Sequence, residues 1–261
     1  MSPASARPEP LIEIEDVHVS FGGKHVLRGV SLVVEKGDTV AILGESGGGK
    51  TVLLKVVLGL LTPRLGRVRV FGTDVVGLGD EELEPIRKRI SVVYQGGALY
   101  SGLTVEENIA LELREILKLP KAEIDRRVRE ALDAVGLGAV DPTLVPDELS
   151  GGMKKRLAVA RAIAPRPEII FYDEPTSGLD PINSVRVLTL IRQLQESLRV
   201  TSVVVTHDLR GACRIANRLV LLAAGRVAFD GPPDDFMKSS DRDVAAFRSA
   251  APGFAEIAAV R

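Results

Sequence analysis

The segment GESGGGKT runs from Gly44 to Thr51, directly after the apolar segment Thr39 to Leu43. Its members are Gly44, Glu45, Ser46, Gly47, Gly48, Gly49, Lys50 and Thr51. The spacing G-x-x-x-x-G-K-[ST] is typical of a phosphate-binding loop: backbone N–H groups cradle phosphate oxygens, the lysine reaches the β- and γ-phosphates, and the hydroxyl binds Mg²⁺. A plain glycine-rich turn is the alternative. A strand before the segment and an apolar helix face after it favour the phosphate loop.

Composition limits the class of protein. The 261 residues include 34 Lys and Arg and 35 Asp and Glu, so the net charge is −1. A chain without a strong positive field is a poor candidate for binding nucleic acid. Hydrophobic residues make up 45% and charged residues 26%, which is typical of a folded globular chain. The single cysteine, Cys213, excludes an internal disulfide, and no Cys/His zinc spacing is present, which indicates a reducing cytosol.

The first ten residues, MSPASARPEP, predict a loose leader, because they lack the apolar core of a signal peptide. No segment approaches the roughly 18 to 20 apolar residues that span a bilayer. We therefore expect any connection with a membrane to be made through a partner.

Short β-branched or alternating segments predict strands along most of the chain. They are Ile12–Val19, Ser31–Val34, Thr39–Leu43, Arg67–Phe71, Ile90–Tyr94, Glu168–Tyr172, Thr201–Thr206 and Leu219–Ala223. Several are apolar throughout, as in strands that are covered on both faces of an α/β sheet. Between Gly96 and Ala164 the apolar period is helical instead, and prolines separate three expected helices. The sequence thus predicts an α/β frame interrupted by a helical block.

A second element that points to a nucleotide is EIIFYDEP, residues 168–175, in which an apolar strand ends in two carboxylates. Asp173 can hold the Mg²⁺ shell, and Glu174 can polarise a water molecule aimed at the γ-phosphate. Alone, an acidic pair at a strand end is more often a turn. After a phosphate loop it predicts the metal and base pair of an ATPase.

The segment LSGGM, residues 149–153, opens the third expected helix with Ser150 as N-cap. Gly151 and Gly152 leave backbone N–H groups uncovered, so the helix start can be an anion site or merely a flexible cap. With the other motifs, the chain resembles the ATP-binding cassette (ABC) ATPases, whose LSGGQ-type signature opens a helix in an inserted lobe. This resemblance implies an α/β P-loop NTPase cassette: a RecA-like core sheet, an N-terminal antiparallel β portion and a helical lobe.

The resemblance covers about residues 11–236 and implies further roles. Gln95 matches the Q-loop glutamine, which touches Mg²⁺ and the attacking water in the family. Asp180 closes SGLD, which matches the D-loop, and His207 matches the switch histidine at the γ-phosphate. Phe21 occupies the place of the adenine-stacking aromatic, where tyrosine is usual. The implied domains are 11–95 with 165–236 for the ATP-binding lobe, 96–164 for the helical lobe and 237–261 for a tail.

A narrower resemblance rests on three stretches. The chain is similar here to the ATPases of Mla/Mce-type lipid transporters, the MlaF- or Ttg2A-like branch. The stretches are LSGGM followed by KKRLAVARAI, the Q-loop stretch YQGGALYSGLTVEENIALELRE, and DEPTSGLDPI. QSGALF and FPLRE are more usual there than QGGALY and LELRE. The resemblance implies a phospholipid cargo, an integral-membrane permease, an MCE-domain lipid-binding protein and a small regulatory subunit. It also places the chain on the cytoplasmic face of the inner membrane.

The family resemblance also implies a mechanism. Two copies bury two ATP molecules head to tail, because one chain carries one phosphate loop and one signature. One copy holds ATP and Mg²⁺ with Lys50, Thr51 and Asp173. The other copy holds the same ATP with Ser150 and Gly152. Glu174 assists the attack of water, and His207 senses the γ-phosphate. Hydrolysis then opens the dimer, and the helical lobe passes the motion to the permease.

Other classes fit less well. A DNA-acting ABC protein needs long coiled coils between Gln95 and Ser150, a translation-type protein needs two cassettes, and a GTPase needs an Asn-Lys-x-Asp motif; none is present. The remaining alternative is the ATPase of an amino-acid or metal importer.

Two surface expectations complete the sequence reading. Leu99, Tyr100 and Leu103 are expected to anchor the permease, unless they pack under their own helical lobe. In the tail, Val244, Phe247 and Phe254 either dock on a second copy or form a surface helix.

Overall fold

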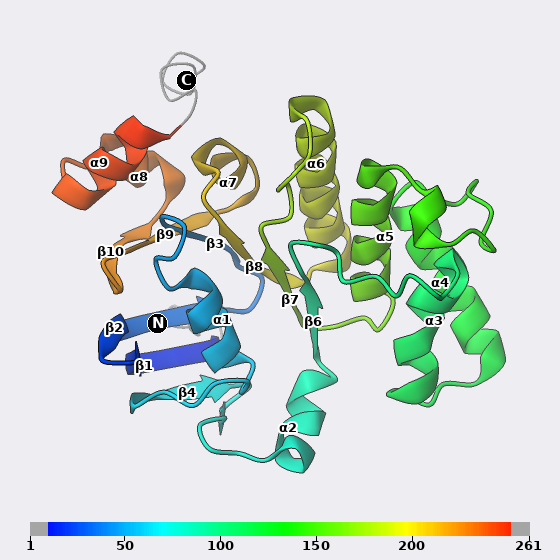
Figure 1. Cartoon of the computed structure of the whole chain (residues 1–261), viewed down its shortest axis with the longest axis horizontal. Helices are drawn as coiled ribbons and strands as arrows, with labels where there is room; N and C mark the ends of the chain where they lie inside the picture. Colours follow the sequence, from blue (N-terminus) through cyan, green and yellow to red (C-terminus); the bar gives the residue numbers. More distant parts are fainter. Residues whose placement is uncertain (1–9, 252–261) are drawn as a thin grey trace, which may run out of the picture. The chain divides into compact units, whose positions relative to one another are not determined.

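The computed structural model describes residues 10–251. These residues divide into two compact units, each containing strands and helices (Figure 1). The first unit combines the residues up to Ile86 with those from Ala216 onward, and the second runs from Arg87 to Ile215. The mixed α/β class agrees with the predicted class. The predicted leader lies almost wholly outside the described residues.

The first unit contains an antiparallel sheet of four strands in the order β2-β1-β4-β5, the predicted N-terminal antiparallel portion. Its strands are β1 (Pro10–Phe21), β2 (Lys24–Glu35), β4 (Leu65–Val70) and β5 (Thr73–Asp74). β2 begins seven residues before the predicted Ser31, because its first half pairs with β1, as in His25 opposite Ser20. Such pairing between strands is a tertiary effect that the apolar period does not reveal.

The rest of the first unit surrounds β3 (Thr39–Leu43), which is buried along its whole length. β9 (Arg218–Ala223) runs parallel to β3, and β10 (Arg226–Gly231) pairs antiparallel with β9. The helices that follow these strands are α1 (Lys50–Val57), α8 (Pro233–Lys238) and α9 (Arg242–Ala250), while α2 (Asp80–Arg87) ends where the second unit begins. β3 therefore delivers the phosphate loop into α1, as predicted.

The second unit has three parallel strands, β6 (Ile90–Val93), β7 (Ile169–Asp173) and β8 (Thr201–Thr206). β7 and β8 are buried at every position, which confirms strands covered on both faces. β7 begins one residue later than predicted. Glu168 lies just before it, and its carboxylate pairs with the Arg89 guanidinium at 2.6 Å on the surface. At its other end the strand extends one residue further than predicted, because Asp173 pairs with Val205 of β8.

Five α-helices complete the second unit. They are α3 (Val105–Glu115), α4 (Lys121–Ala134), α5 (Gly151–Ile163), α6 (Pro181–Leu198) and α7 (Leu209–Ile215), with a 3₁₀ turn at Pro146–Glu148. α3, α4 and α5, which lie together in Figure 1, are the three helices predicted for the helical block. Local signals set their starts: Thr104 and Glu107 form a capping box, and Pro120 precedes α4.

The tail folds against its own unit in the described part. Val244 on α9 is fully buried, and the Phe247 ring meets Phe236 edge to face with centroids 6.5 Å apart. The Arg248 guanidinium donates hydrogen bonds to carbonyls at the end of α8. The tail thus forms a helix, which was one of its two predicted alternatives, and Val244 and Phe247 pack α9 onto its own unit. Phe254 lies outside the described residues.

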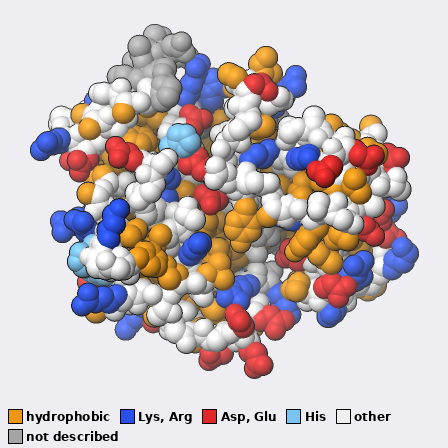
Figure 2. All heavy atoms as spheres, in the orientation of Figure 1, with side chains coloured by type: hydrophobic (Ala, Val, Ile, Leu, Met, Phe, Trp, Pro, Cys, Tyr) orange, Lys and Arg blue, Asp and Glu red, His pale blue; other side chains and the backbone are white. Residues whose placement is uncertain are grey.

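Charged side chains of both signs are interspersed over the face shown in Figure 2, as the near-zero net charge predicts. Across residues 10–251, none of the helices has the length and apolar character that crossing a membrane requires.

Candidate active site

The phosphate loop leaves β3 at Gly44 and enters α1 at Lys50. Lys50 is buried, and its Nζ donates hydrogen bonds to the carbonyl oxygens of Gly44 at 2.8 Å and Glu45 at 2.9 Å. The first turn of α1 carries no acidic side chain, and no side chain caps it. A lysine held inside the loop and uncapped helix N–H groups form a cradle that fits phosphate oxygens. Glu45, Ser46 and Gly47 are exposed, Gly48 is half-buried, and Thr51 is exposed at the helix start.

Gly49 shows why this loop needs glycine. Its φ is +98°, and an added Cβ would lie 2.8 Å from Cδ2 of Leu27, which is fully buried on β2. A side chain at this position would be strained and would push the loop away from β2. The antiparallel sheet therefore sets the position of the phosphate loop through Leu27.

Phe21 ends β1 at the turn into β2. Gly22 and Gly23 form this two-residue turn with φ values of +52° and +81°, as in a type I′ hairpin. The Phe21 side chain is 49% exposed, so its ring is available for stacking. Its role against adenine stays a prediction.

The second unit brings Glu174 and His207 together. Nδ1 of His207 lies 2.9 Å from Oε1 of Glu174, and the hydroxyl of Thr206 donates to Oε2 at 3.1 Å. The Glu174 side chain is 14% exposed, whereas His207 is 59% exposed. A carboxylate held by two neighbours and largely shielded from water suits a general base. The sequence did not single out Thr206, whose only signal was its position before His207.

The backbone at Glu174 is unusual. Its φ is +48°, a left-handed conformation that is uncommon for a residue with a side chain. The Glu174 N–H donates to the carbonyl of Val205 at 2.8 Å, which ties the end of β7 to the end of β8. Strain of this kind is found where a fold over-determines the placement of a functional group. Here it directs Glu174 toward the end of β8, where Thr206 and His207 lie.

The Q-loop follows β6. The side chain of Gln95 is exposed, and its Nε2 donates to the hydroxyl of Ser177 at 3.0 Å. The structure thus links the predicted Q-loop to the predicted D-loop. Lys155 on α5 donates to the main-chain oxygen of Gln95. Sequence reasoning missed Lys155 as a site residue, although the basic segment after LSGGM was its signal.

Ser150 is the N-cap of α5, as predicted. Its hydroxyl oxygen accepts a hydrogen bond from the Met153 N–H at 3.3 Å. The hydroxyl proton of Ser150 remains for an anion, because accepting one bond leaves the O–H donor unused. Gly151 is exposed, Gly152 is half-buried, and the first turn has no acidic residue. This helix start therefore has the donors that a phosphate group needs.

The D-loop leads into α6. Asp180 caps this helix by accepting hydrogen bonds from the N–H groups of Ile182 and Asn183, both at 3.0 Å. These bonds, with one from the Asn183 side chain, lower the pKa of the Asp180 carboxyl. Asp180 has a structural role at the helix start, and its predicted contact with nucleotide stays a prediction.

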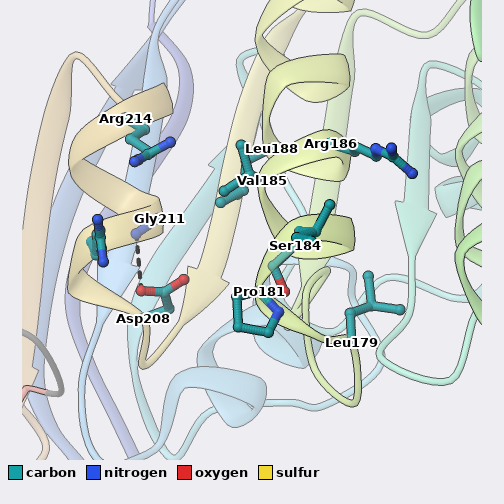
Figure 3. Close-up of a pocket in the computed structure, with 11 residues that line it drawn as sticks. Leu179, Pro181, Ser184, Val185, Arg186, Leu188, Asp208, Gly211 and Arg214 are labelled. Atoms are coloured by element: carbon teal, nitrogen blue, oxygen red, sulfur yellow. Dashed lines mark hydrogen bonds between the residues drawn. The ribbon is translucent and has the colours of Figure 1, made fainter.

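A hollow of 690 Å³ lies between α6 and α7, next to the D-loop. Figure 3 shows Pro181, Val185 and Leu188 on the α6 side of this hollow, with Asp208 and Arg214 on the other side. Asp208 accepts a hydrogen bond from the Gly211 N–H at 2.9 Å, so it also orders the start of α7. Ile182 also lines the hollow and is 67% exposed. The D-loop therefore continues into an uncovered apolar surface.

Magnesium needs few protein ligands in sites of this kind, because phosphate oxygens and water complete its octahedron. Asp173 is buried at the end of β7, and its carboxylate chemistry suits the ion. Thr51 supplies a hydroxyl oxygen and Gln95 an amide oxygen. Residues 10–251 contain no group of three His, Cys, Asp or Glu residues arranged for a metal. The three named residues stay predicted ligands.

A buried lysine in a strand–loop–helix cradle and a shielded glutamate beside a histidine at neighbouring strand ends define a P-loop ATPase. Residues 27–177 match the family model described as ABC transporter. The chain belongs to the ABC transporter family, and it is an ATP-binding, ATP-hydrolysing subunit of a transporter.

Two relatives and one solved structure show how close the similarity is. The chain is 40% identical over 238 residues to the intermembrane phospholipid transport system ATP-binding protein MlaF of Haemophilus influenzae, covering 91% of this chain and 89% of that protein. It is 39% identical over 227 residues to the methionine import ATP-binding protein MetN of Brucella abortus, covering 87% of this chain and 61% of that protein. The solved structure is the dimeric ATP-binding cassette MJ0796 bound to ADP and Pi, which is 33% identical with a TM-score of 0.76. The match covers 85% of this chain and 98% of that chain.

Proposed function

We propose that two copies of the chain enclose two ATP molecules head to tail and drive a membrane permease that carries phospholipid. The phospholipid assignment is carried by one observation, the 40% identity to an intermembrane phospholipid transport ATPase. The Q-loop stretch, residues 94–115, also supports the phospholipid assignment, because it resembles the corresponding stretch of the lipid-transport ATPases. The methionine importer relative is nearly as similar, so an amino-acid permease is the alternative.

Three features support the head-to-tail dimer. The hollow beside the D-loop includes apolar side chains, and its lining residue Ile182 is 67% exposed in a single copy. The cradle at Lys50 and the donors at Ser150 belong to different units of the chain, and one ATP uses one cradle and one signature in this family. The relative MJ0796 cassette is dimeric in its ADP- and Pi-bound structure.

Within each site we assign a step to each side chain. Lys50 and the N–H groups of the loop bind phosphate oxygens, and Phe21 stacks on adenine. Glu174 accepts a proton from the attacking water, while His207, with Nδ1 on Glu174, offers Nε2 to the γ-phosphate. Mg²⁺, when bound by Thr51, Asp173 and Gln95, neutralises phosphate charge. Ser150 from the second copy closes the site.

The surface for the permease is a groove of 450 Å³ in the second unit, which we call the aromatic groove. Its lining includes Tyr94, Tyr100, Leu111, Glu112, Ile116 and Arg161. Tyr94, Tyr100 and Ile116 are 42%, 53% and 46% exposed. On the face shown in Figure 2, hydrophobic side chains gather among charged ones over α3 and α5. Of the three predicted anchors only Tyr100 lines the groove, because Leu99 packs against the buried core of the unit and Leu103 is half-buried.

The charges of the aromatic groove indicate the kind of segment it binds. Burial raises the pKa of the Glu112 carboxyl, and the Arg161 charge works against that rise. The Arg161 guanidinium also lies over the Tyr100 ring, 5.8 Å from its centroid. Aromatic walls beside carboxylates suit an amphipathic helix that carries a basic residue. Such docking places the chain at the cytoplasmic face of the membrane.

Tyr100→Glu is expected to weaken binding to the permease at least about tenfold, since it puts a charge where an apolar contact is made. ATP affinity should stay unchanged. Affinity purification from membranes in mild detergent measures the permease recovered per ATPase. Leu198→Glu is the control, because Leu198 is 50% exposed on the same unit but outside the groove. Equal recovery with Tyr100→Glu and wild type contradicts the docking surface.

The same purification tests the cargo. We expect the wild-type chain to recover a permease that is associated with an MCE-domain protein and carries phospholipid, together with a small regulatory subunit. Mass spectrometry identifies the proteins, and lipid extraction identifies the cargo. Recovery of an amino-acid permease that depends on a soluble binding protein contradicts the phospholipid proposal and leaves the ATPase assignment standing.

Asn108 holds the loop that presents Tyr100. This fully buried side chain accepts a hydrogen bond from the Tyr100 N–H at 2.9 Å and donates to the carbonyls of Tyr100, Leu103 and Thr104. Asn108→Leu keeps the volume but leaves buried groups unsatisfied, so the free energy of unfolding should fall by about 2–3 kcal/mol. Urea unfolding measures this loss. A change below about 0.5 kcal/mol would show that water replaces the bonds.

A further inference from the structure

Two cations of the signature helix α5 hold the main chain of the Q-loop. The Arg161 guanidinium donates to the carbonyl of Gly97 at 2.8 Å and to that of Ala98 at 2.6 Å. The Lys155 ammonium donates to the carbonyl of Gln95. The held segment is sharply bent, with φ values of +76° at Gly97 and +45° at Ala98. The Q-loop thus follows the position of α5.

Lys155 differs from Arg161 in what else it faces. Arg161 lies toward the aromatic groove, over Tyr100, whereas the charge of Lys155 interacts with Glu174. Burial lowers the pKa of the Lys155 ammonium, and the negative charge of Glu174 opposes that decrease. Lys155 is thus a half-buried cation that is bonded to the Q-loop backbone and whose charge acts on the carboxylate that we assign as the base. No motif of the family resemblance assigned a role to it.

We propose that Lys155 is a positioning residue for ATP hydrolysis, holding the Gln95 main chain against α5 and holding the Glu174 carboxylate by its charge. A hydrogen bond from an ammonium group is roughly twice as strong as a neutral one, and partial burial strengthens both interactions. The inference rests on the proposed role of Glu174. It predicts an effect on turnover rather than on ATP binding, because the cradle around Lys50 is built from a different part of the chain.

Three substitutions in the full chain separate the two parts of this role. Lys155→Met removes charge and donor and should lower kcat about tenfold, the size of one charge-assisted hydrogen bond, with the KM for ATP within about twofold of wild type. Lys155→Gln keeps a hydrogen-bond donor without the charge, so its kcat should lie between that of Lys155→Met and that of wild type. Lys155→Arg keeps both and should restore kcat to within about threefold.

The neighbouring Lys154 provides a matched control. Its ammonium pairs with Asp147 at 3.1 Å on the surface, so Lys154→Met removes the same charge from the same helix. Its kcat should stay within about twofold of wild type. Thermal unfolding of all variants checks that they fold alike.

A double substitution tests whether Lys155 acts through Glu174. Adding Lys155→Met to Glu174→Gln should lower kcat by a smaller factor than adding it to wild type, because the part of the role that acts through the carboxylate is already gone and only the hold on the Gln95 main chain is lost. The inference is overturned if Lys155→Met has the kcat of wild type, or if Lys155→Arg loses as much kcat as Lys155→Met. It is also overturned if Lys155→Met changes the KM for ATP and leaves kcat as it is. A wild-type rate in Glu174→Gln contradicts the assignment of the base instead, so the two failures are distinguishable.

Discussion

Glu174→Gln is expected to lower ATP turnover by about a hundredfold or more while ATP still binds. The amide has the size of the carboxylate and keeps hydrogen-bond contacts with Thr206 and His207, but it cannot accept a proton from water. With ATP bound and not hydrolysed, the dimer should accumulate in its closed form. Phosphate release measures turnover, and size-exclusion chromatography with and without ATP measures dimerisation.

The control for this prediction lies at the other end of the same strand. Glu168 precedes β7, and its carboxylate makes a surface pair with Arg89. Glu168→Gln makes the same chemical change at a distance from the strand end and should keep turnover near the wild-type rate. Turnover by Glu174→Gln close to wild type would mean that another group activates the water.

Lys50→Ala and Ser150→Arg subunits are each expected to be nearly inactive alone and to regain activity when mixed. Each homodimer has two damaged sites, whereas a mixed dimer has one site with both defects and one with neither. Random mixing makes half of the dimers mixed, so the recovered rate should reach up to about a quarter of wild type. Phosphate release at a series of mixing ratios measures the recovery.

The matched control replaces the Lys50→Ala subunit with the double variant Lys50→Ala/Ser150→Arg. No pairing of this double variant with Ser150→Arg contains an intact site, so activity should not return. If the first mixture is also no more active than the sum of its parts, Ser150 does not act on the ATP that is held by Lys50 of the other copy. The head-to-tail proposal would then be wrong.

Much of the fold could be predicted because local sequence patterns specify its strands and helix starts. The apolar segments around Ile170 and Val204 predicted buried strands, and Thr104 with Glu107 marks a helix start by two local hydrogen bonds. The spacing of the phosphate loop required a strand before Gly44 and a helix from Lys50, and both are present. β10 and α8 were missed because their segments are short, whereas α9 is the helix that was offered as one alternative for the tail.

By itself the sequence determined which chemistry the chain carries: a phosphate cradle, a carboxylate pair at a strand end and a capped signature helix. These depend on residues within a few positions of one another, so local backbone geometry is enough to specify them. Only the tertiary structure decided which distant groups meet. Lys155 reaches an oxygen 60 positions away, Glu174 meets His207 across 33, and Tyr100 is exposed whereas Leu99 packs inward. Such contacts follow from how strands and helices pack, and no periodicity along the chain records that packing.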